Sequence, residues 1–146
     1  MIQRIQSIYL LLASAAAFSA LRWPFYYTPV PTAFEVDGSQ QYSTLITLAF
    51  SACLSFITIF LYGNRMLQLK VVLVNLILSG LIGFFIYKVV LMHPGGGFTL
   101  PSVALFLIPV LQILSVIRIY KDESLVKASD RLRSVSYTHL RAHETL

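Results

Sequence analysis

Hydroxyl side chains recur inside an apolar run of this sequence and are its best candidates for chemistry. They follow one another in steps of three and four residues at Thr44, Thr47, Ser51, Ser55 and Thr58. This spacing places them on one face of a helix. Such a face bonds neighbouring helices, at about 0.6 kcal/mol per contact in a membrane, or lines a path for a polar solute. Because hydroxyls also bond back to their own helix, we favour packing over a path.

Two further sets of residues extend this choice between packing and a path. Asn75, Ser79 and Gly83 repeat every four residues on the next apolar run, and this small-residue stripe predicts a helix interface. Asn75 and Gln112 are the amides that would complete a solute path if the hydroxyl face lined one. We therefore treat all of these positions as packing or pathway candidates.

Catalysis is poorly supported by the rest of the sequence. A hydrolytic nucleophile needs a positioned base, and residues 1–133 contain one histidine, His93, and no carboxylate inside an apolar run. The single cysteine, Cys53, excludes a disulfide within the chain and a thiolate metal cluster. We predict that the protein is not an enzyme and that it uses no cofactor or metal.

Four apolar runs position these residues. The chain has 146 residues, of which 57% are hydrophobic and only 12% charged, against about a quarter charged in soluble domains. Each run approaches the roughly 20 residues that cross a bilayer. The sequence predicts an all-α integral membrane four-helix bundle over residues 1–133, with spans at about 5–23, 43–62, 70–91 and 101–120.

Local signals mark where these spans begin and end. Residues 23–27 form an aromatic cluster, which favours a retained first helix over a cleaved signal peptide. Residues 32–41, with Asp37-Gly38 as turn chemistry, suggest a small hairpin. Residues 61–70 form a polar hinge, and residues 93–97 break the third span. Pro109 predicts a kink or local unwinding in the fourth.

The distribution of Lys and Arg predicts the orientation, because positive flanks stay in the cytoplasm. With both termini cytoplasmic, Arg22 and Lys88 alone lie toward the outside. The inner side then carries Arg4, Arg65, Lys70, Arg118, Lys121, Lys127, Arg131 and Arg133. Because these residues punctuate apolar runs, the net charge of +5 does not indicate nucleic acid as a partner. The lipid bilayer is the partner they indicate.

An amphipathic cytoplasmic extension follows the fourth span over residues 118–133. Glu123 and Lys127 have helix-supporting spacing. Asp122, Glu123 and Asp130 offset the attraction of the basic residues to lipid, which favours a membrane-protein partner or a second copy. The alternative is that this face is solvated and only fixes the orientation of the protein in the membrane. The docking candidates are Leu125, Lys127, Arg131, Leu132 and Arg133.

Residues 134–146 show neither the apolar pattern of the spans nor the amphipathic pattern of residues 118–133. The stretch VSYTHLRAHET, residues 135–145, resembles a codon-by-codon translation of the mosaic-end adaptor used in transposon-based sequencing libraries. His139 and His143 stand at helical spacing, but we expect no metal site there. We treat residues 134–146 as a non-native tail, to be excluded from fold reasoning.

Three blocks also carry a family resemblance: MIQRIQSIYLLLA at the start, LYGNRMLQLK in the hinge and KDESLVKASDRLR at residues 121–133. Their order and spacing resemble the bacterial membrane family catalogued as domain of unknown function 4293, found mainly in Bacteroidetes. The family ending resembles SADRLR, whereas residues 128–133 here read ASDRLR. The resemblance implies a four-span inner-membrane protein and supplies no activity.

These observations leave two classes of function open. The first is a small membrane scaffold or accessory subunit whose basic C-terminal helix docks in the cytoplasm. The alternative is a small oligomeric permease or channel that uses the hydroxyl-lined helix faces. The localisation expected for either is the bacterial inner membrane, with several passes.

Overall fold

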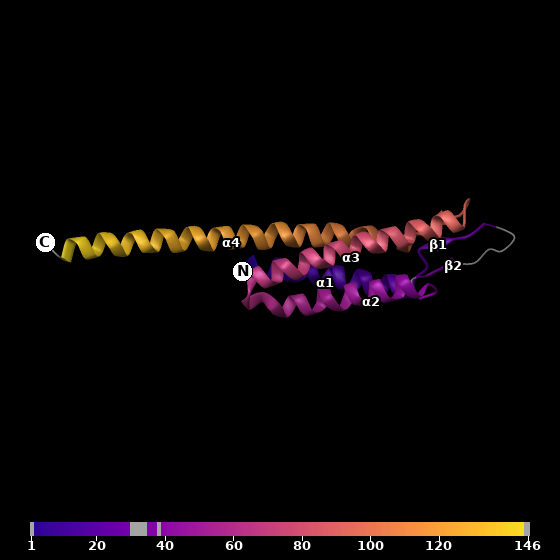
Figure 1. Cartoon of the computed structure of the whole chain (residues 1–146), viewed down its shortest axis with the longest axis horizontal. Coiled ribbons are helices and arrows are strands. Elements are labelled where there is room, and N and C mark those ends of the chain that lie inside the picture. Colours follow the sequence, from indigo (N-terminus) through magenta and orange to yellow (C-terminus); the bar gives the residue numbers. More distant parts are fainter. Residues whose placement is uncertain (1, 30–34, 38, 145–146) are drawn as a thin grey trace.

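The computed structural model describes residues 2–29, 35–37 and 39–144 and is dominated by four long helices (Figure 1). These are α1 (Ile2–Arg22), α2 (Tyr42–Phe60), α3 (Arg65–Met92) and α4 (Val103–Glu144). All four are long and apolar enough to cross a membrane. The predicted all-α bundle with four membrane-spanning helices is therefore confirmed.

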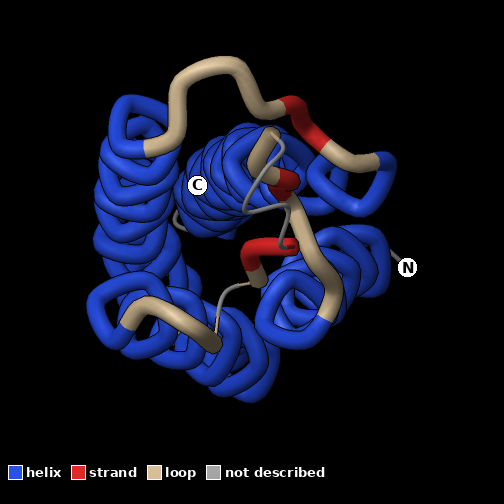
Figure 2. Tube along the Cα trace, turned by 90° about the vertical axis from the view of Figure 1, so that its right-hand side faces the viewer, coloured by secondary structure: helices blue, strands red, loops and turns tan. Residues whose placement is uncertain are grey.

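The helices form a closed ring. α1 packs against α2 and α4, and α3 fills the gap between α2 and α4, as the view along the bundle shows (Figure 2). Successive helices run in opposite directions, so the N-terminus lies at the same end as the turn between α2 and α3 (Figure 1). We call this the inner end, because α4 leaves the bundle here and carries the C-terminus away from it.

The buried positions explain the packing. On α3 they follow steps of four and three residues, at Gln68, Val72, Asn75, Ser79, Ile82, Ile86 and Val89. On α4 the same spacing joins Leu105, Ile108, Gln112, Ser115, Ile119 and Asp122. This is the seven-residue repeat of helices that pack as in a coiled coil. Large apolar side chains such as Ile77 and Phe106 are exposed on the outside, as lipid-facing positions are.

The same repeat corrects the prediction for Gly83. A stripe of four-residue steps through Asn75 and Ser79 predicted it at a helix interface, but Gly83 is exposed and a side chain added there would meet open space. Positions that are always four residues apart rotate gradually around a helix, so they leave the face that a seven-residue repeat keeps. The buried face therefore continues through Ile82 and Ile86 instead.

A small sheet closes the outer end of the bundle. β1 (Tyr26–Tyr27) lies between β2 (Glu35–Val36) and β3 (Gly97–Phe98), and both pairs are antiparallel. Gly96 permits this closeness, because a Cβ there would lie 2.2 Å from the Tyr27 carbonyl oxygen. The hairpin suggested for residues 32–41 lies partly outside the described residues, and the pairing that is described joins residues 35–36 to β1 instead.

Two details differ from the sequence prediction. The hinge is shorter than residues 61–70, because α3 already begins at Arg65 and its Gln68 is buried against α2. What remains is the short 3₁₀ turn Leu61–Gly63 followed by Asn64. In α4, Pro109 lies inside an unbroken helix, so the local unwinding considered there does not occur. Membrane helices tolerate such a proline because their surroundings satisfy the freed backbone groups.

α4 continues far beyond the inner end of the bundle (Figure 1). It runs without interruption past Arg133 and through most of the predicted non-native tail, ending at Glu144. From Ser124 onward, every side chain that the structure describes is exposed. We call residues 124–144 the projecting segment.

Candidate functional site

A layer of polar side chains crosses the bundle between two apolar clusters. The inner cluster contains Leu10, Val72 and Ile119, and the outer cluster includes Leu48, Ile82 and Ile108. On α1, α3 and α4 the polar residues stand between members of these two clusters, and on α2 Ser55 stands between Ala52 of the outer cluster and Ile59, which packs against the inner one. This central polar layer consists of Ser14, Ser51, Ser55, Asn75, Ser79, Gln112 and Ser115, all buried.

Asn75 connects the layer across α2 and α3. Its Nδ2 donates to Ser55 Oγ at 2.6 Å and to the Ser51 carbonyl oxygen at 3.3 Å. Ser14 Oγ of α1 donates to the Ala52 carbonyl oxygen of α2 at 3.1 Å. Hydroxyls and amides of the layer therefore join three neighbouring helices, which is the packing role considered for the hydroxyl face.

Other hydroxyl side chains, among them the predicted Ser79, Thr58 and Thr47, donate to carbonyl oxygens of their own helix. Ser79 Oγ donates to the Leu76 carbonyl oxygen at 2.7 Å, and Ser115 Oγ donates to that of Leu111 at 2.9 Å. Thr58 Oγ1 donates to the Leu54 carbonyl oxygen at 2.5 Å. Thr47 is only half-buried and donates to the carbonyl oxygens of Ser43 and Thr44. It lies at the margin of the hydroxyl face rather than inside the layer.

Some polar atoms of the layer have no hydrogen-bond partner among the described protein atoms. They are Ser51 Oγ, Asn75 Oδ1, and both Gln112 Oε1 and Gln112 Nε2. Gln112 is 0% exposed, so water outside the protein does not reach it. A buried polar group left unpaired costs about 1–3 kcal/mol. These atoms therefore mark the layer as more than packing material.

A second polar cluster lies at the inner end of the bundle. Gln6 Nε2 of α1 donates to Asp122 Oδ2 of α4, and Asp122 is only 7% exposed. Arg65 Nη1 donates to the Asp122 carbonyl oxygen at 3.4 Å, and Gln68 Nε2 donates to the Thr58 carbonyl oxygen at 3.2 Å. This cluster ties the base of the projecting segment to α1 and α3.

Sequence reasoning missed this role of Asp122. It grouped the residue with the solvated charges of the extension, because Lys121 and Glu123 flank it. The signal that would have found it is the seven-residue repeat of α4, which runs from Leu105 to Ile119 and reaches Asp122 at the next step. The charge of Asp122 alone predicted a solvated position, whereas the side chain is buried.

Apolar side chains fill much of the interior on the outer side of the central polar layer, although Thr44 and Ser102 are also buried near the outer end. Phe25 is 1% exposed and Tyr26 is 2% exposed, and both belong to the outer cluster with Leu48 and Ile108. These side chains lie between the central polar layer and the sheet. Apolar side chains of α1, α3 and α4 therefore separate most of the layer from the outer end of the bundle.

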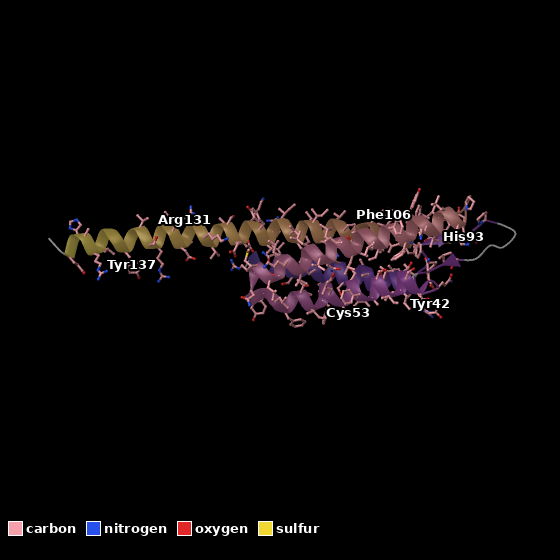
Figure 3. The ribbon with its side chains drawn as sticks, viewed as in Figure 1. Tyr42, Cys53, His93, Phe106, Arg131 and Tyr137 are labelled. Carbon is pink, nitrogen blue, oxygen red and sulfur yellow. The ribbon has the colours of Figure 1, made fainter. Side chains whose placement is uncertain are left out.

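The projecting segment presents the other candidate surface. All five predicted docking residues, Leu125, Lys127, Arg131, Leu132 and Arg133, are exposed. Leu132 is 74% exposed, and it lines a shallow groove with Ser124, Lys127, Ala128 and Arg131. The side chains of Arg131 and Tyr137 extend from a stretch of α4 that has no other helix beside it (Figure 3). Glu123 and Lys127 form an ion pair at 3.4 Å.

Comparison with protein families gives a single finding. A family model described as domain of unknown function (DUF4293) matches residues 2–132. No curated protein and no solved structure matches the chain. The matched residues include the whole bundle and the first part of the projecting segment.

Proposed function

Because this chain belongs to the DUF4293 family, whose description names no activity, we propose a function from its geometry. The protein is a small multi-pass membrane scaffold or accessory subunit, and not an enzyme. It docks a partner protein on the projecting segment of α4, at residues 124–133. The residues after 133 take no part, because we also propose that they are a non-native tail.

The exposure of the projecting segment is the observation that carries this proposal. Leu125 is 59% exposed and Leu132 is 74% exposed, on a stretch of helix that packs against no other helix. Apolar exposure needs no explanation within the spans, where lipid covers it. Residues 124–133 are about 15 Å long, and because most helical stability in proteins comes from packing, this stretch lacks the main source of it. A partner that covers the leucines supplies the missing burial.

The charges of the segment favour protein over lipid as that partner. Lys127, Arg131 and Arg133 each contribute about 1 kcal/mol close to an anionic surface. Asp130 and the nearby Glu123 oppose that attraction, and Lys127 is already paired with Glu123. Mixed charges around an apolar strip suit a complementary protein surface, which they also help to orient.

We also propose that the inner end of the bundle faces the cytoplasm of a bacterial cell, with the protein in the inner membrane. The end that carries the turn between α2 and α3 holds Arg65 and Lys70, and Arg118 and Lys121 lie on the same side. Arg22 and Lys88 lie toward the sheet at the other end. This asymmetry is what the positive-inside rule requires.

Replacing Leu125 and Leu132 with Ser tests the docking proposal without changing any charge. A photo-reactive cross-linker at Ala128 should capture a discrete partner in native membranes, and L125S/L132S should abolish that product at unchanged abundance. V126S is the matched control, because Val126 is also exposed (40%) but lies off the seven-residue spacing that places Leu125 and Leu132 on one face of the helix. Unchanged cross-linking in the double variant would contradict docking and leave an orientation role only.

A second candidate, a small oligomeric permease or channel, is favoured by one observation. The central polar layer holds unpaired amide and hydroxyl atoms at Ser51, Asn75 and Gln112, as a solute path would. The apolar side chains that α1, α3 and α4 bury on the outer side of the layer argue against a path through a single bundle. Liposomes containing the purified protein should show no faster uptake of small neutral solutes or ions than empty liposomes. Faster uptake that Q112L removes would favour the permease.

A further inference from the structure

We infer that the central polar layer is a binding site for ordered water, held by Gln112 of α4, Asn75 of α3 and Ser51 of α2. This inference does not depend on the docking proposal, because it concerns the interior of the bundle. It rests on the position of these three residues and on the hydrogen-bonding capacity that they leave unused.

The three residues lie at one level of the bundle. α3 and α4 run antiparallel, and the groove between them brings Ser79 together with Pro109. Moving one turn toward the inner end leads to Asn75 on α3 and to Gln112 and Ile113 on α4. Asn75 in turn bonds the Ser51 carbonyl oxygen. Gln112 therefore faces the layer at the depth where Asn75 meets α2.

The unpaired atoms specify the chemistry of the ligand. Asn75 Oδ1 and Gln112 Oε1 accept hydrogen bonds, Gln112 Nε2 donates them, and Ser51 Oγ does both. A ligand that satisfies this set must itself donate and accept. A metal cation would satisfy the oxygens but leave the amide N–H groups unpaired, and an anion would do the reverse. A neutral hydrogen-bonding molecule fits both.

Burial and the lack of charge then select water. Each of the three side chains is at most 1% exposed, and apolar clusters lie on both the inner and outer sides of the layer. No ionisable side chain belongs to the layer to balance a charged ligand. Buried waters bind in this way, with two to four protein partners that are otherwise unsatisfied. Water donates to Asn75 Oδ1 and Gln112 Oε1 and accepts from Ser51 Oγ or Gln112 Nε2.

Such water has a defined role in the fold. Asn75 and Ser55 already join α3 to α2 directly, whereas Gln112 makes no direct bond to either helix. Water in the layer therefore supplies a polar link between α4 and the pair α2 and α3 at this depth, beside the hydrogen bond from Arg65 to Asp122 at the inner end. α4 also carries the projecting segment, so this link helps to fix the helix from which docking takes place.

Water-edited solid-state NMR of the full chain in lipid bilayers tests the inference. Magnetisation from water should reach the side-chain amide of Gln112, and that of Asn75, faster than the methyl groups of Val72, which is equally buried in the inner cluster. In Gln112→Leu, which removes the polar atoms at similar volume, the fast transfer to Asn75 should be lost.

Ser115→Ala is the matched control, because Ser115 Oγ is bonded to the Leu111 carbonyl oxygen of its own helix. Fast transfer to Asn75 should persist in this variant. Transfer to Asn75 as slow as to Val72 in the wild-type protein would overturn the inference, even if Gln112→Leu failed to fold. Fast transfer that survives in a folded Gln112→Leu protein would also overturn it, because Gln112 would then not hold the water.

Discussion

The two parts of α4 form one continuous helix but lie in different environments. Up to Asp122, polar side chains such as Gln112 and Ser115 point inward and are buried, while apolar ones such as Phe106 are exposed. From Ser124 onward, polar and apolar side chains are exposed alike. In the first part the bilayer explains the exposed apolar surface. The bilayer does not surround the second part in our account. We propose that a partner protein covers its exposed apolar side chains instead.

The largest effect should come from filling the polar interior of the bundle. Ser51 and Ser55 are both 0% exposed, so Leu at both positions overpacks the core, at about 1–3 kcal/mol for each site. It also removes the Ser55 hydroxyl that accepts from Asn75. We expect loss of folded protein by size-exclusion chromatography in detergent.

Phe56→Leu provides the comparison for that variant. Phe56 lies on the same helix and is 46% exposed toward lipid, so its replacement by another apolar residue should be tolerated. If the double serine variant folded as well as F56L, the hydroxyl face would have to lie toward lipid, and the division between interior and exterior would fail.

A smaller effect should follow from Asp122→Ala, at the junction of the two parts. The variant leaves Gln6 Nε2 buried without its acceptor, which costs about 1–3 kcal/mol. A lower Tm in detergent is the expected result. Asp130→Ala, on the exposed part of the helix, should leave the Tm unchanged. Equal Tm values for the two variants would place Asp122 in solvent, as its charge alone suggested.

The smallest effect should come from removing residues 134–146. Every side chain described in this stretch is exposed, and our account assigns it to a translated adaptor. Deletion should change neither membrane insertion nor abundance on an immunoblot, and resequencing of the source DNA should give a different ending near Arg133. Genomic DNA that encodes VSYTHLRAHET would contradict the adaptor origin.

The sequence predicted the number and type of the long apolar helices because each rests on local hydropathy, which a bilayer constrains strongly. It misplaced Gly83 and Asp122 for a different reason. Their burial depends on which face of a helix meets its neighbours, and neither the four-residue spacing used for Gly83 nor the charge used for Asp122 identifies that face. Asp122 also needed Gln6, which lies 116 residues away, and no local pattern joins the two.

The sheet at the outer end shows the same limit. The sequence alone predicts from Gly95, Gly96 and Gly97 that the third span ends here. The need for Gly96 in particular arises from the approach of Tyr27, whose segment is far away in the chain. Candidate packing residues were found from spacing, but the atoms that remain unpaired at Gln112 depend on the packing of three helices and had no signal in the sequence.

We propose that α4 passes from lipid into the cytoplasm between the bundle and the projecting segment. Single cysteines test it most directly, after Cys53→Ser removes the native exposed thiol. Ile113→Cys lies on the lipid-facing part of α4, where Ile113 is 47% exposed, and Leu132→Cys lies on the projecting segment. Maleimides react with the thiolate, which forms in water and not in lipid.

The measurement is labelling by a membrane-impermeant maleimide in intact cells and in inside-out vesicles. Our account predicts that Leu132→Cys is labelled in inside-out vesicles and protected in intact cells, while Ile113→Cys is labelled in neither. Labelling of Leu132→Cys in intact cells would reverse the proposed orientation. Protection of Leu132→Cys in both preparations, matched by Ile113→Cys, would place the whole of α4 in the membrane and contradict the account.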